Sequence, residues 1–254
     1  MALPRTPSFR LDGRRAVVTG AGRGIGAAMA AALADAGAHV TLAARTKAEV
    51  DALAGEIRAG GGAADAAVLD VRDLAAVAAI FAGRPAFNIL VNNAGTNRPK
   101  PYSDVTEDDY DAVVDLNLKA AFFVAQGAAK RMQEERVSGS LIHMSSQMGH
   151  VGYAGRSLYC ASKWGLEGLS KALALDLAPY GIRSNVIAPT FVETPMTKPM
   201  FENKTFRDDV LTRIKLGRLC RLEDLMGAVV YLASDASAMM TGTSMIVDGG
   251  WTAD

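Results

Sequence analysis

The feature that most constrains the fold of this chain is a short apolar run, Arg15–Thr19, that leads through a glycine-rich turn into an alanine-rich stretch. The β-branched residues of the run favour a strand. The alanine-rich stretch Ile25–Ala36 predicts a helix, and Gly37 stands where a helix commonly ends. A strand followed so closely by an apolar helix buries its surface by packing that helix on a sheet. We therefore expect an α/β fold.

Apolar runs and helical patterns alternate along the rest of the chain. The later predicted strands are 39–43, 66–69, 88–91, 140–144, 183–187 and 244–247. The later predicted helices are 47–59, 74–81, 108–135 and 158–178. This alternation favours parallel strands with helices on both faces, and Gly60-Gly61-Gly62 is expected to be a loop. We predict a single-domain, doubly wound parallel sheet of the Rossmann type over residues 1–254.

Composition excludes several classes of protein. The 27 Lys and Arg residues balance the 27 Asp and Glu residues, so nothing favours a nucleic-acid partner. No stretch approaches the roughly 20 apolar residues of a membrane-spanning helix, and residues 1–7 lack a signal-peptide pattern. The two cysteines and three histidines are scattered without ligand spacing, which predicts no metal site. We expect a cytoplasmic protein with a small-molecule substrate and no membrane partner.

The glycine-rich turn predicts a dinucleotide site. Glycines let the backbone approach a pyrophosphate closely, and the N-terminus of the following helix offers free N–H groups. The spacing is Gly-x-x-x-Gly-x-Gly, which differs from the commoner Gly-x-Gly-x-x-Gly. The expected cofactor-binding residues of this turn are Gly20, Gly22, Arg23, Gly24, Ile25 and Gly26.

This spacing resembles the Thr-Gly-x-x-x-Gly-x-Gly loop of the short-chain dehydrogenase/reductase family. Three later segments are similar to motifs of that family and follow in the same order, which extends the resemblance over nearly the whole chain. The resemblance implies further cofactor contacts: Asp70 and Val71 at the adenine ring, Asn93, Ala94 and Gly95 at the adenosine site, and Pro189, Val192 and Thr194 at the nicotinamide carboxamide. Thr190 stands where the family usually has glycine.

The end of the second predicted strand bears on the choice between NAD and NADP. An acidic residue there binds the ribose 2′-hydroxyl, whereas a nearby arginine accommodates a 2′-phosphate. Alignment with the family places Ala44 at the acidic position and Arg45 directly after it, and Arg23 offers a second cation. Both arginines could equally be solvated surface charges. On balance we expect NADP(H) rather than NAD(H).

Tyr159 and Lys163 suggest the chemistry, because their i, i+4 spacing puts them on one face of a helix. A free tyrosine has a pKa of about 10, and a nearby ammonium group favours its phenolate. An isolated Tyr-x-x-x-Lys more often only packs. Two further polar residues change that balance: Ser146 follows an apolar strand, and Asn117 lies within an apolar helical stretch.

The resemblance assigns a catalytic role to each of these four residues. Tyr159 transfers a proton to or from the substrate oxygen, and Ser146 rather than Ser145 hydrogen-bonds that oxygen. Lys163 lowers the pKa of the tyrosine and holds the nicotinamide ribose. Asn117 holds a water molecule, through its main chain and side chain, that continues the proton relay. The reaction implied is the interconversion of a secondary alcohol and a ketone.

The substrate end is less constrained. A lid is expected at about 190–216, where the composition is irregular. The expected substrate contacts before Tyr159 are His150, Tyr153 and Arg156, which favour a hydroxylated or carboxylated substrate. Arg156 is either a clamp for a carboxylate or a partner for another protein group. The sequence looks most similar to family members acting on sugars, aldonates and related keto acids.

Two other functions and an assembly remain to be weighed. Reductases of 3-oxoacyl groups on an acyl carrier protein share all these motifs, and Lys198, Lys204 and Arg207 offer cations for such a carrier. A non-catalytic redox sensor is disfavoured, because such proteins usually lose the tyrosine or the lysine. The helix around 166–178 and the C-terminal 247–251 resemble the surfaces through which relatives form homotetramers.

Overall fold

The computed structural model describes residues 3–194 and 197–253. Within them, parallel strands form a 7-stranded sheet in the order β3-β2-β1-β4-β5-β6-β7. The strands are β1 (Arg15–Thr19), β2 (His39–Ala44), β3 (Ala63–Val68), β4 (Ile89–Asn92), β5 (Gly139–Met144), β6 (Ile182–Pro189) and β7 (Ser244–Val247). The chain winds outward in both directions from β1 and β4, so the predicted doubly wound parallel sheet is confirmed.

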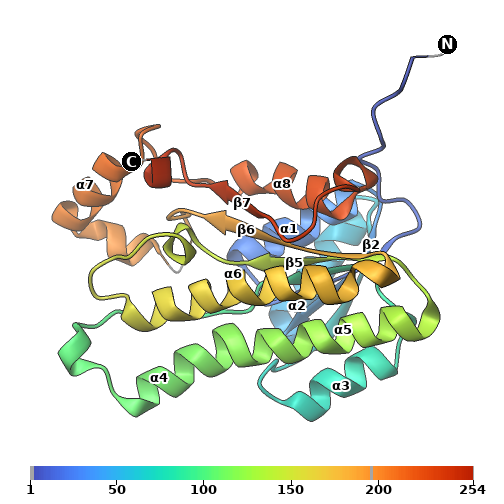
Figure 1. Ribbon diagram of the computed structural model, residues 1–254, viewed down its shortest axis with the longest axis horizontal. Coiled ribbons are helices and arrows are strands. Elements are labelled where there is room, and N and C mark those ends of the chain that lie inside the picture. The colour runs from blue at the N-terminus through green and yellow to red at the C-terminus, as the bar shows by residue number, and fades with distance from the viewer. Residues whose placement is uncertain (1–2, 195–196, 254) are drawn as a thin grey trace.

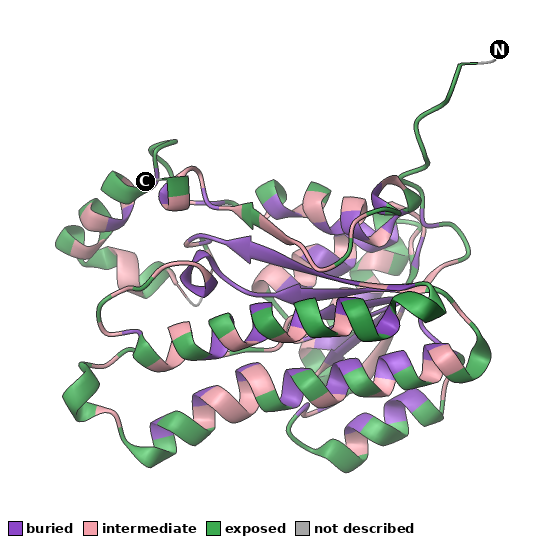
Figure 2. Cartoon of the chain, in the orientation of Figure 1, coloured by how far each residue is buried: buried purple, intermediate pink, exposed green. Residues whose placement is uncertain are grey.

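Helices cover both faces of the sheet (Figure 1). One apolar core lies under α1 (Gly24–Asp35), α2 (Lys47–Ala59) and α8 (Glu223–Ala233). The opposite core lies under α3 (Leu74–Ala82), α5 (Ala121–Glu135) and the end of α6 (Ser157–Leu177). Successive residues of β1 alternate between the two cores, with Val18 in the first and Val17 in the second. The inner strands β2, β1, β4, β5 and β6 are mostly buried, whereas the edge strands β3 and β7 are partly exposed (Figure 2).

One long helical run departs from regular geometry. α4 (Glu107–Val114) begins in a capping box between Thr106 and Asp109, and a π-helical turn, Asp115–Ala120, joins it to α5. Among described residues, the run Glu107–Glu135 alone is long and apolar enough to pass a length-and-composition test for a membrane span. Its apolar side packs on α3, α6 and β4, which accounts for that composition.

Two elements differ from the sequence-based expectation. β3 begins three residues earlier than expected, because Ala63-Ala64-Asp65 pairs with β2 without the β-branched residues that mark a strand. α8 was not predicted at all, although Leu225, Val229 and Leu232 recur at helical spacing and are buried. The glycine-rich loop at 60–62 and the last strand, Ser244–Val247, lie where they were expected.

The segment at 190–216 lies beyond the carboxyl end of β6, at the left of Figure 1. It contains a short 3-10 helix, Lys198–Glu202, and α7 (Lys204–Arg213); Pro195 and Met196 lie outside the described residues. Apolar side chains of this segment pack with Tyr153 and Trp251 in a separate small core. We call it the aromatic cluster, and it includes Tyr153, Phe191, Phe201, Phe206, Val210, Ile214 and Trp251.

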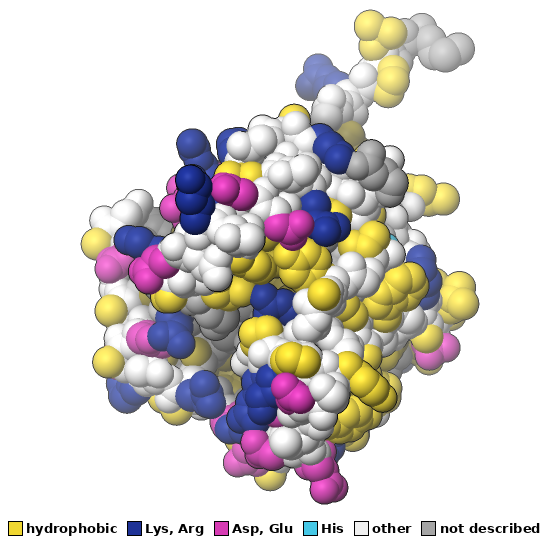
Figure 3. All heavy atoms as spheres, turned by 90° about the vertical axis from the view of Figure 1, so that its left-hand side faces the viewer, with side chains coloured by type: hydrophobic (Ala, Val, Ile, Leu, Met, Phe, Trp, Pro, Cys, Tyr) yellow, Lys and Arg dark blue, Asp and Glu magenta, His cyan; other side chains and the backbone are white. Residues whose placement is uncertain are grey.

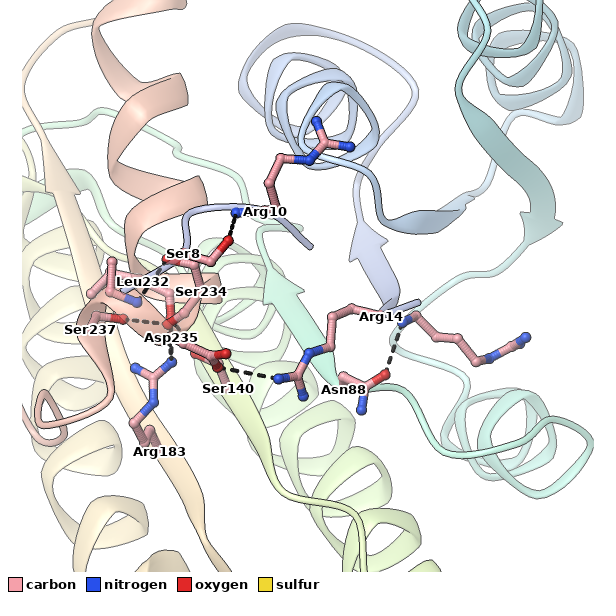
Figure 4. A network of polar contacts seen from close by, with 12 residues as sticks. Ser8, Arg10, Arg14, Asn88, Ser140, Arg183, Leu232, Ser234, Asp235 and Ser237 are labelled. Atoms are coloured by element: carbon pink, nitrogen blue, oxygen red, sulfur yellow. Dashed lines mark hydrogen bonds and ion pairs between the residues drawn. The ribbon is translucent and has the colours of Figure 1, made fainter. Parts of the chain in front are cut away.

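The opposite edge of the sheet, at the amino ends of the strands, is closed by a polar network (Figure 4). Arg183 donates to the carbonyl oxygens of Leu232 and Ser234 at 2.7 and 3.3 Å. Ser140 donates to the same Leu232 carbonyl at 2.8 Å. These bonds tie β5 and β6 to the end of α8, so this network serves the fold.

Candidate active site

Tyr159 and Lys163 are brought together on the first turns of α6. The Lys163 ammonium nitrogen lies 5.5 Å from the centroid of the Tyr159 ring and donates to the carbonyl oxygen of Met144 at 2.7 Å. That bond joins α6 to the carboxyl end of β5. The lysine is buried, with 5% of its surface exposed, and burial lowers its pKa to about 8 while Glu167 opposes the shift.

Burial and nearby polar groups act on Tyr159 in opposite directions. Burial raises the pKa of its hydroxyl, and a hydrogen bond with Ser146 and the charge of Arg156 act in the lowering direction. The Lys163 ammonium group donates to the Met144 carbonyl. The expectation that Lys163 lowers the tyrosine pKa stays a prediction.

Ser146 lies directly after β5, where it caps a short 3-10 helix, Gln147–Gly149. Its hydroxyl donates to Gln147 Oε1 at 2.7 Å and accepts from the backbone N–H of Met148 at 3.2 Å. It also hydrogen-bonds Tyr159, which the neighbouring Ser145 does not. The structure thus brings Ser146, as expected, to the phenol.

Asn117 lies in the π-helical turn and is only 1% exposed. Its side-chain oxygen accepts from the backbone N–H of Thr96 at 2.8 Å, and its nitrogen donates to the Thr96 carbonyl at 2.9 Å and to Ser162 Oγ at 3.1 Å. Both polar atoms of the side chain therefore bind protein. These bonds tie the loop after β4 to α6. The expectation that Asn117 holds a water molecule stays a prediction.

The glycine-rich turn has the geometry that a dinucleotide pyrophosphate requires. Gly20 and Gly24 adopt positive φ angles of 63° and 58°, which favour glycine. A Cβ on Gly26 would lie 2.3 Å from the Gly20 carbonyl oxygen, so only glycine lets α1 start so close to the strand. Ile25 follows in the first turn of α1, whose amino end faces this loop. A dinucleotide phosphate fits this cradle.

Asn93 and Thr19 stabilise the glycine-rich turn through hydrogen bonds. The Asn93 amide nitrogen donates to the carbonyl oxygens of Thr19 and Gly20 at 2.9 and 3.3 Å. The Thr19 hydroxyl oxygen accepts from the backbone N–H groups of Asn93 and Ala94 at 3.0 and 3.2 Å. Gly95 lies close to Asn117 and Lys163: a Cβ on it would be 3.2 Å from Asn117 Oδ1 and 3.7 Å from Lys163 Nζ.

The remaining expected cofactor residues surround the same edge. Asp70 follows β3 and accepts two hydrogen bonds from the guanidinium group of Arg72, at 3.1 and 2.7 Å, and Val71 beside it is buried. Thr194 reaches back to the turn, since its Cγ2 lies 3.7 Å from the place of a Cβ on Gly24. Pro189 ends β6, and Val192 forms a bridge with Cys220. Thr190 donates through its backbone to Val247.

The two arginines considered for a 2′-phosphate differ in their surroundings. Arg23 lies 3.7 Å from a Glu49 carboxylate oxygen, so an acid already compensates its charge. Arg45 is exposed at the end of β2 and forms no ion pair within the described residues. Its charge does act on Asp70, whose pKa is lowered first by Arg72 and more weakly by Arg45. Among the described residues, Arg45 is therefore an unpaired cation at the end of β2.

The three expected substrate contacts also differ from one another. His150 Nε2 lies 2.9 Å from Ser244 Oγ and 3.2 Å from Glu167 Oε1, so that nitrogen is committed to α6 and β7. Tyr153 donates its hydroxyl to Asp209 of α7 at 2.7 Å. Only Arg156 has no side-chain hydrogen bond or ion pair among the described residues, although just 5% of it is exposed.

Sequence reasoning missed the residues that hold the 190–216 segment in place. Arg213 pairs with Asp209 at 3.2 Å, and its guanidinium group lies over the rings of Tyr153 and Trp251, 5.5 and 5.7 Å from their centroids. The i, i+4 spacing of Asp209 and Arg213 was a readable signal. Nothing in the sequence indicated their contact with Tyr153.

Among residues 3–194 and 197–253, no group of His, Cys, Asp and Glu side chains could hold a metal ion.

Comparisons with known proteins agree with this geometry. Residues 20–252 match the family model described as enoyl-(acyl carrier protein) reductase. D-erythrulose reductase of Gallus gallus is 36% identical over 96% of this chain and 98% of that protein. The 3-oxoacyl-[acyl-carrier-protein] reductase of Thermotoga maritima is 38% identical over 95% of this chain and 99% of that protein.

A solved structure extends the likeness to three dimensions. It is a gluconate 5-dehydrogenase from Burkholderia cenocepacia in complex with NADP and tartrate, with a TM-score of 0.93 and 38% identity. The match covers 97% of this chain and 98% of that one. The turn, the sheet and the polar cluster at its carboxyl edge therefore belong to one shared architecture.

Proposed function

Because the chain belongs to the short-chain dehydrogenase/reductase family of NAD(P)-dependent enzymes that act on CH–OH groups, we propose that it interconverts a secondary alcohol and a ketone on a sugar, a sugar acid or a related hydroxy or keto acid. The observation that carries this proposal is the cluster of Ser146, Tyr159 and Lys163 at the carboxyl end of β5. The identities of D-erythrulose reductase and gluconate 5-dehydrogenase support the substrate class.

In this proposal each polar group of the cluster acts on one atom. Tyr159 gives a proton to the substrate oxygen during reduction and takes it during oxidation. Ser146 donates a hydrogen bond to the same oxygen and stabilises the charge that develops there. Lys163, fixed by the Met144 carbonyl, offers its ammonium group to the ribose hydroxyls of the dinucleotide. The nicotinamide, when bound, supplies or accepts the hydride.

We further propose NADP(H) as the preferred cofactor. Ala44 leaves the ribose 2′-hydroxyl without an acidic partner, and the exposed, unpaired guanidinium group of Arg45 can meet a 2′-phosphate. The NADP bound in the gluconate 5-dehydrogenase structure supports this choice for a related fold. The measurement is kcat/KM with each cofactor, and a clear preference for NAD(H) would overturn the assignment.

The reaction itself is tested with a panel of substrates. We would assay aldonates, alditols and ketoses, D-gluconate and D-erythrulose among them, with both cofactors by absorbance at 340 nm. Turnover of at least one such compound, lost in Tyr159→Phe, is the expected result. No turnover anywhere in the panel would remove the proposal.

A second candidate is reduction of a 3-oxoacyl group on an acyl carrier protein. A hollow beside α7 is lined by the basic side chains of Lys198, Arg207, Arg218 and Arg221 together with Glu193, which suits an acidic carrier. Acetoacetyl thioester with NADPH, assayed beside the panel, separates the two. A sensor without turnover is not pursued, because relatives over the whole chain are dehydrogenases and reductases.

We also propose a homotetramer in the cytoplasm. Phe122, Trp164 and Leu175 expose 41%, 54% and 79% of their surface on α5 and α6, and such apolar faces are commonly covered by a second copy. Light scattering tests the assembly, and a monomer would contradict it.

A further inference from the structure

A buried positive charge without a partner lies beside the phenol of Tyr159. Arg156 is the residue that precedes α6, and its charge acts on Tyr159 one helical turn later. Only 5% of Arg156 is exposed, and burial lowers its pKa. Burying a charge is costly unless an opposite charge or several hydrogen bonds compensate it. Such compensation is missing among the described residues.

The nearby carboxylates are already committed. Asp209 accepts hydrogen bonds from Tyr153 and Arg213, and Glu167 is shared by His150 and Ser244. The groups whose charges would raise the pKa of Arg156 are Tyr153, Tyr159 and Cys160, and tyrosine and cysteine side chains are ordinarily neutral at pH 7. The described residues therefore offer Arg156 no anion.

Arg183 shows how this chain treats a buried arginine that serves the fold. Its guanidinium group donates to the carbonyl oxygens of Leu232, Ser234 and Met240. Burial lowers the pKa of Arg183 as it does that of Arg156, but the hydrogen bonds of Arg183 are made within the chain. The guanidinium nitrogens of Arg156 are also not among the fully enclosed unpaired atoms, so they keep access to the outside. The unpaired guanidinium group of Arg156 is therefore not sealed within the fold.

We infer that Arg156 binds a carboxylate group of the substrate, and that the enzyme acts on sugar acids or related hydroxy acids in preference to neutral sugars, alditols or acyl thioesters. This inference rests on the proposed function and narrows its substrate class. The planar guanidinium group suits a carboxylate because it donates two parallel hydrogen bonds. The phosphates of the dinucleotide do not supply this anion, since they belong at the turn before α1.

The hollow end of the molecule agrees with an anionic, partly apolar ligand. Figure 3 looks onto the end that carries α7, and it shows a recess bordered by hydrophobic and basic side chains. Tyr153, which shares its surroundings with Arg156, belongs to the aromatic cluster under α7.

The test uses pairs of substrates that differ only at C1: each aldonate of four to six carbons and the alditol of the same configuration, for example D-gluconate and D-glucitol. Wild type is expected to have at least tenfold higher kcat/KM for the aldonates. Arg156→Met should lower kcat/KM for the aldonates about 100-fold more than for the alditols, chiefly through KM, because both classes lose the charge that acts on Tyr159 but only the aldonates lose the carboxylate contact. Arg156→Lys should recover part of the loss, because it restores the charge without the planar fork.

Two controls keep the result interpretable. Lys130→Met removes an exposed cation of α5 and should leave the aldonate-to-alditol ratio unchanged. Arg156→Met should melt at the wild-type temperature or above and bind NADP(H) as wild type does, since no hydrogen bond of the fold is removed and an uncompensated buried charge is lost. Calorimetry of the NADP⁺ complex with each aldonate and alditol gives a readout that does not depend on turnover.

The inference and the proposed function fail in different ways. Turnover of alditols or ketoses with no preference for aldonates would keep the function and overturn the role of Arg156. An aldonate preference that Arg156→Met leaves intact, or that Lys130→Met removes, would overturn it as well. Turnover of acetoacetyl thioester alone would remove both. Failure of every aldonate to bind in calorimetry would overturn the inference whatever the panel shows.

Discussion

The two edges of the sheet treat their polar groups differently. At the amino edge, Ser140 and Arg183 donate to backbone carbonyls, and Asn88 accepts from the backbone N–H of Arg15 at 2.9 Å. At the carboxyl edge, enclosed polar atoms of Ser145 and Thr190 have no hydrogen-bond partner among the described residues. Among the described residues, the amino edge leaves Arg15 Nε without a partner but satisfies the polar groups of Ser140, Arg183 and Asn88, whereas the carboxyl edge leaves Ser145, Gln147 and Thr190 each with an unpaired enclosed atom.

This difference separates what the fold needs from what the chemistry needs. An unsatisfied buried polar group costs about 1–3 kcal/mol, so a chain selected only for stability would not collect several at one edge. Groups that wait for a ligand have to carry that cost in the free protein. The comparison therefore predicts that changes at the carboxyl edge affect turnover, whereas changes at the amino edge affect the free energy of unfolding.

The largest effect is expected at Tyr159. Tyr159→Phe removes the hydroxyl that exchanges the proton, and kcat should fall about 10³-fold or more while NADP(H) binding stays within a few-fold of wild type. Ser140→Ala at the amino edge is the matched change: it should leave kcat alone and lower the free energy of unfolding by about 1 kcal/mol. A Tyr159→Phe enzyme with a tenth of wild-type kcat would place the proton donor elsewhere.

His143 gives a pH test of the carboxyl edge. It is fully buried on β5, and burial, with a smaller contribution from the Lys163 charge, lowers its pKa from 6.5 to about 4. As the pH falls, His143 of the unfolded chain takes up a proton near pH 6.5, whereas His143 of the folded protein does so only near pH 4. The free energy of unfolding is therefore highest above pH 6.5 and falls as the pH drops through this window. The loss should reach roughly 3 kcal/mol.

The measurement is the free energy of unfolding in urea at several pH values between 6.5 and 4. His143→Gln cannot take the proton, so its stability should decline less steeply with acid than that of wild type. Equal slopes for wild type and His143→Gln would show that His143 is not held neutral.

Arg45 tests the cofactor end of the same edge. Arg45→Ala should lower kcat/KM for NADPH about tenfold and change that for NADH by less than about twofold, because only NADPH carries the 2′-phosphate. Arg23→Ala is the comparison, and its effect should be smaller since Glu49 already faces Arg23 at 3.7 Å. Equal losses with both cofactors would mean that Arg45 does not meet the phosphate.

The smallest effect is expected at the contact between Tyr153 and α7. Tyr153→Phe removes one of the hydrogen bonds to Asp209, and Asp209→Asn weakens those from both Tyr153 and Arg213. If these bonds hold α7 over the substrate, KM should rise about threefold in the first variant and more in the second, with kcat nearly unchanged. Asp208→Asn, on the exposed side of α7, is the control. A fall in kcat without a change in KM would assign α7 another role.

The cofactor end was predictable because backbone geometry makes it. Gly20, Gly24 and Gly26 occupy places where a side chain would strain or fill the turn, so the turn requires glycine at these positions. Their spacing can therefore be recognised in the sequence. The i, i+4 spacing of Tyr159 and Lys163 fixed their face of α6 in the same way. These features depend on local geometry, which a sequence pattern records directly.

The substrate end was less predictable because contacts between distant residues make it. His150 was expected to face the substrate, but its ring nitrogen meets Glu167 and Ser244, which lie 17 and 94 residues later, and the second separation is invisible in a local pattern. The direction of the Lys163 ammonium group likewise depends on the Met144 carbonyl. The structure was needed to show that Asp209 accepts hydrogen bonds from Tyr153 and Arg213. Arg156 is left without a partner among the described residues.

Asn117 lies in the π-helical turn Asp115–Ala120, so the direction of its side chain depends on the number of residues in this turn. A π turn is equivalent to one extra residue inserted in an α-helix. Each residue of a regular α-helix rotates the next by about 100°, so deleting one residue from this turn would swing either α4 or α5 around its axis relative to the other. A change in chain length, with no change in polarity, would then separate the loop after β4 from α6.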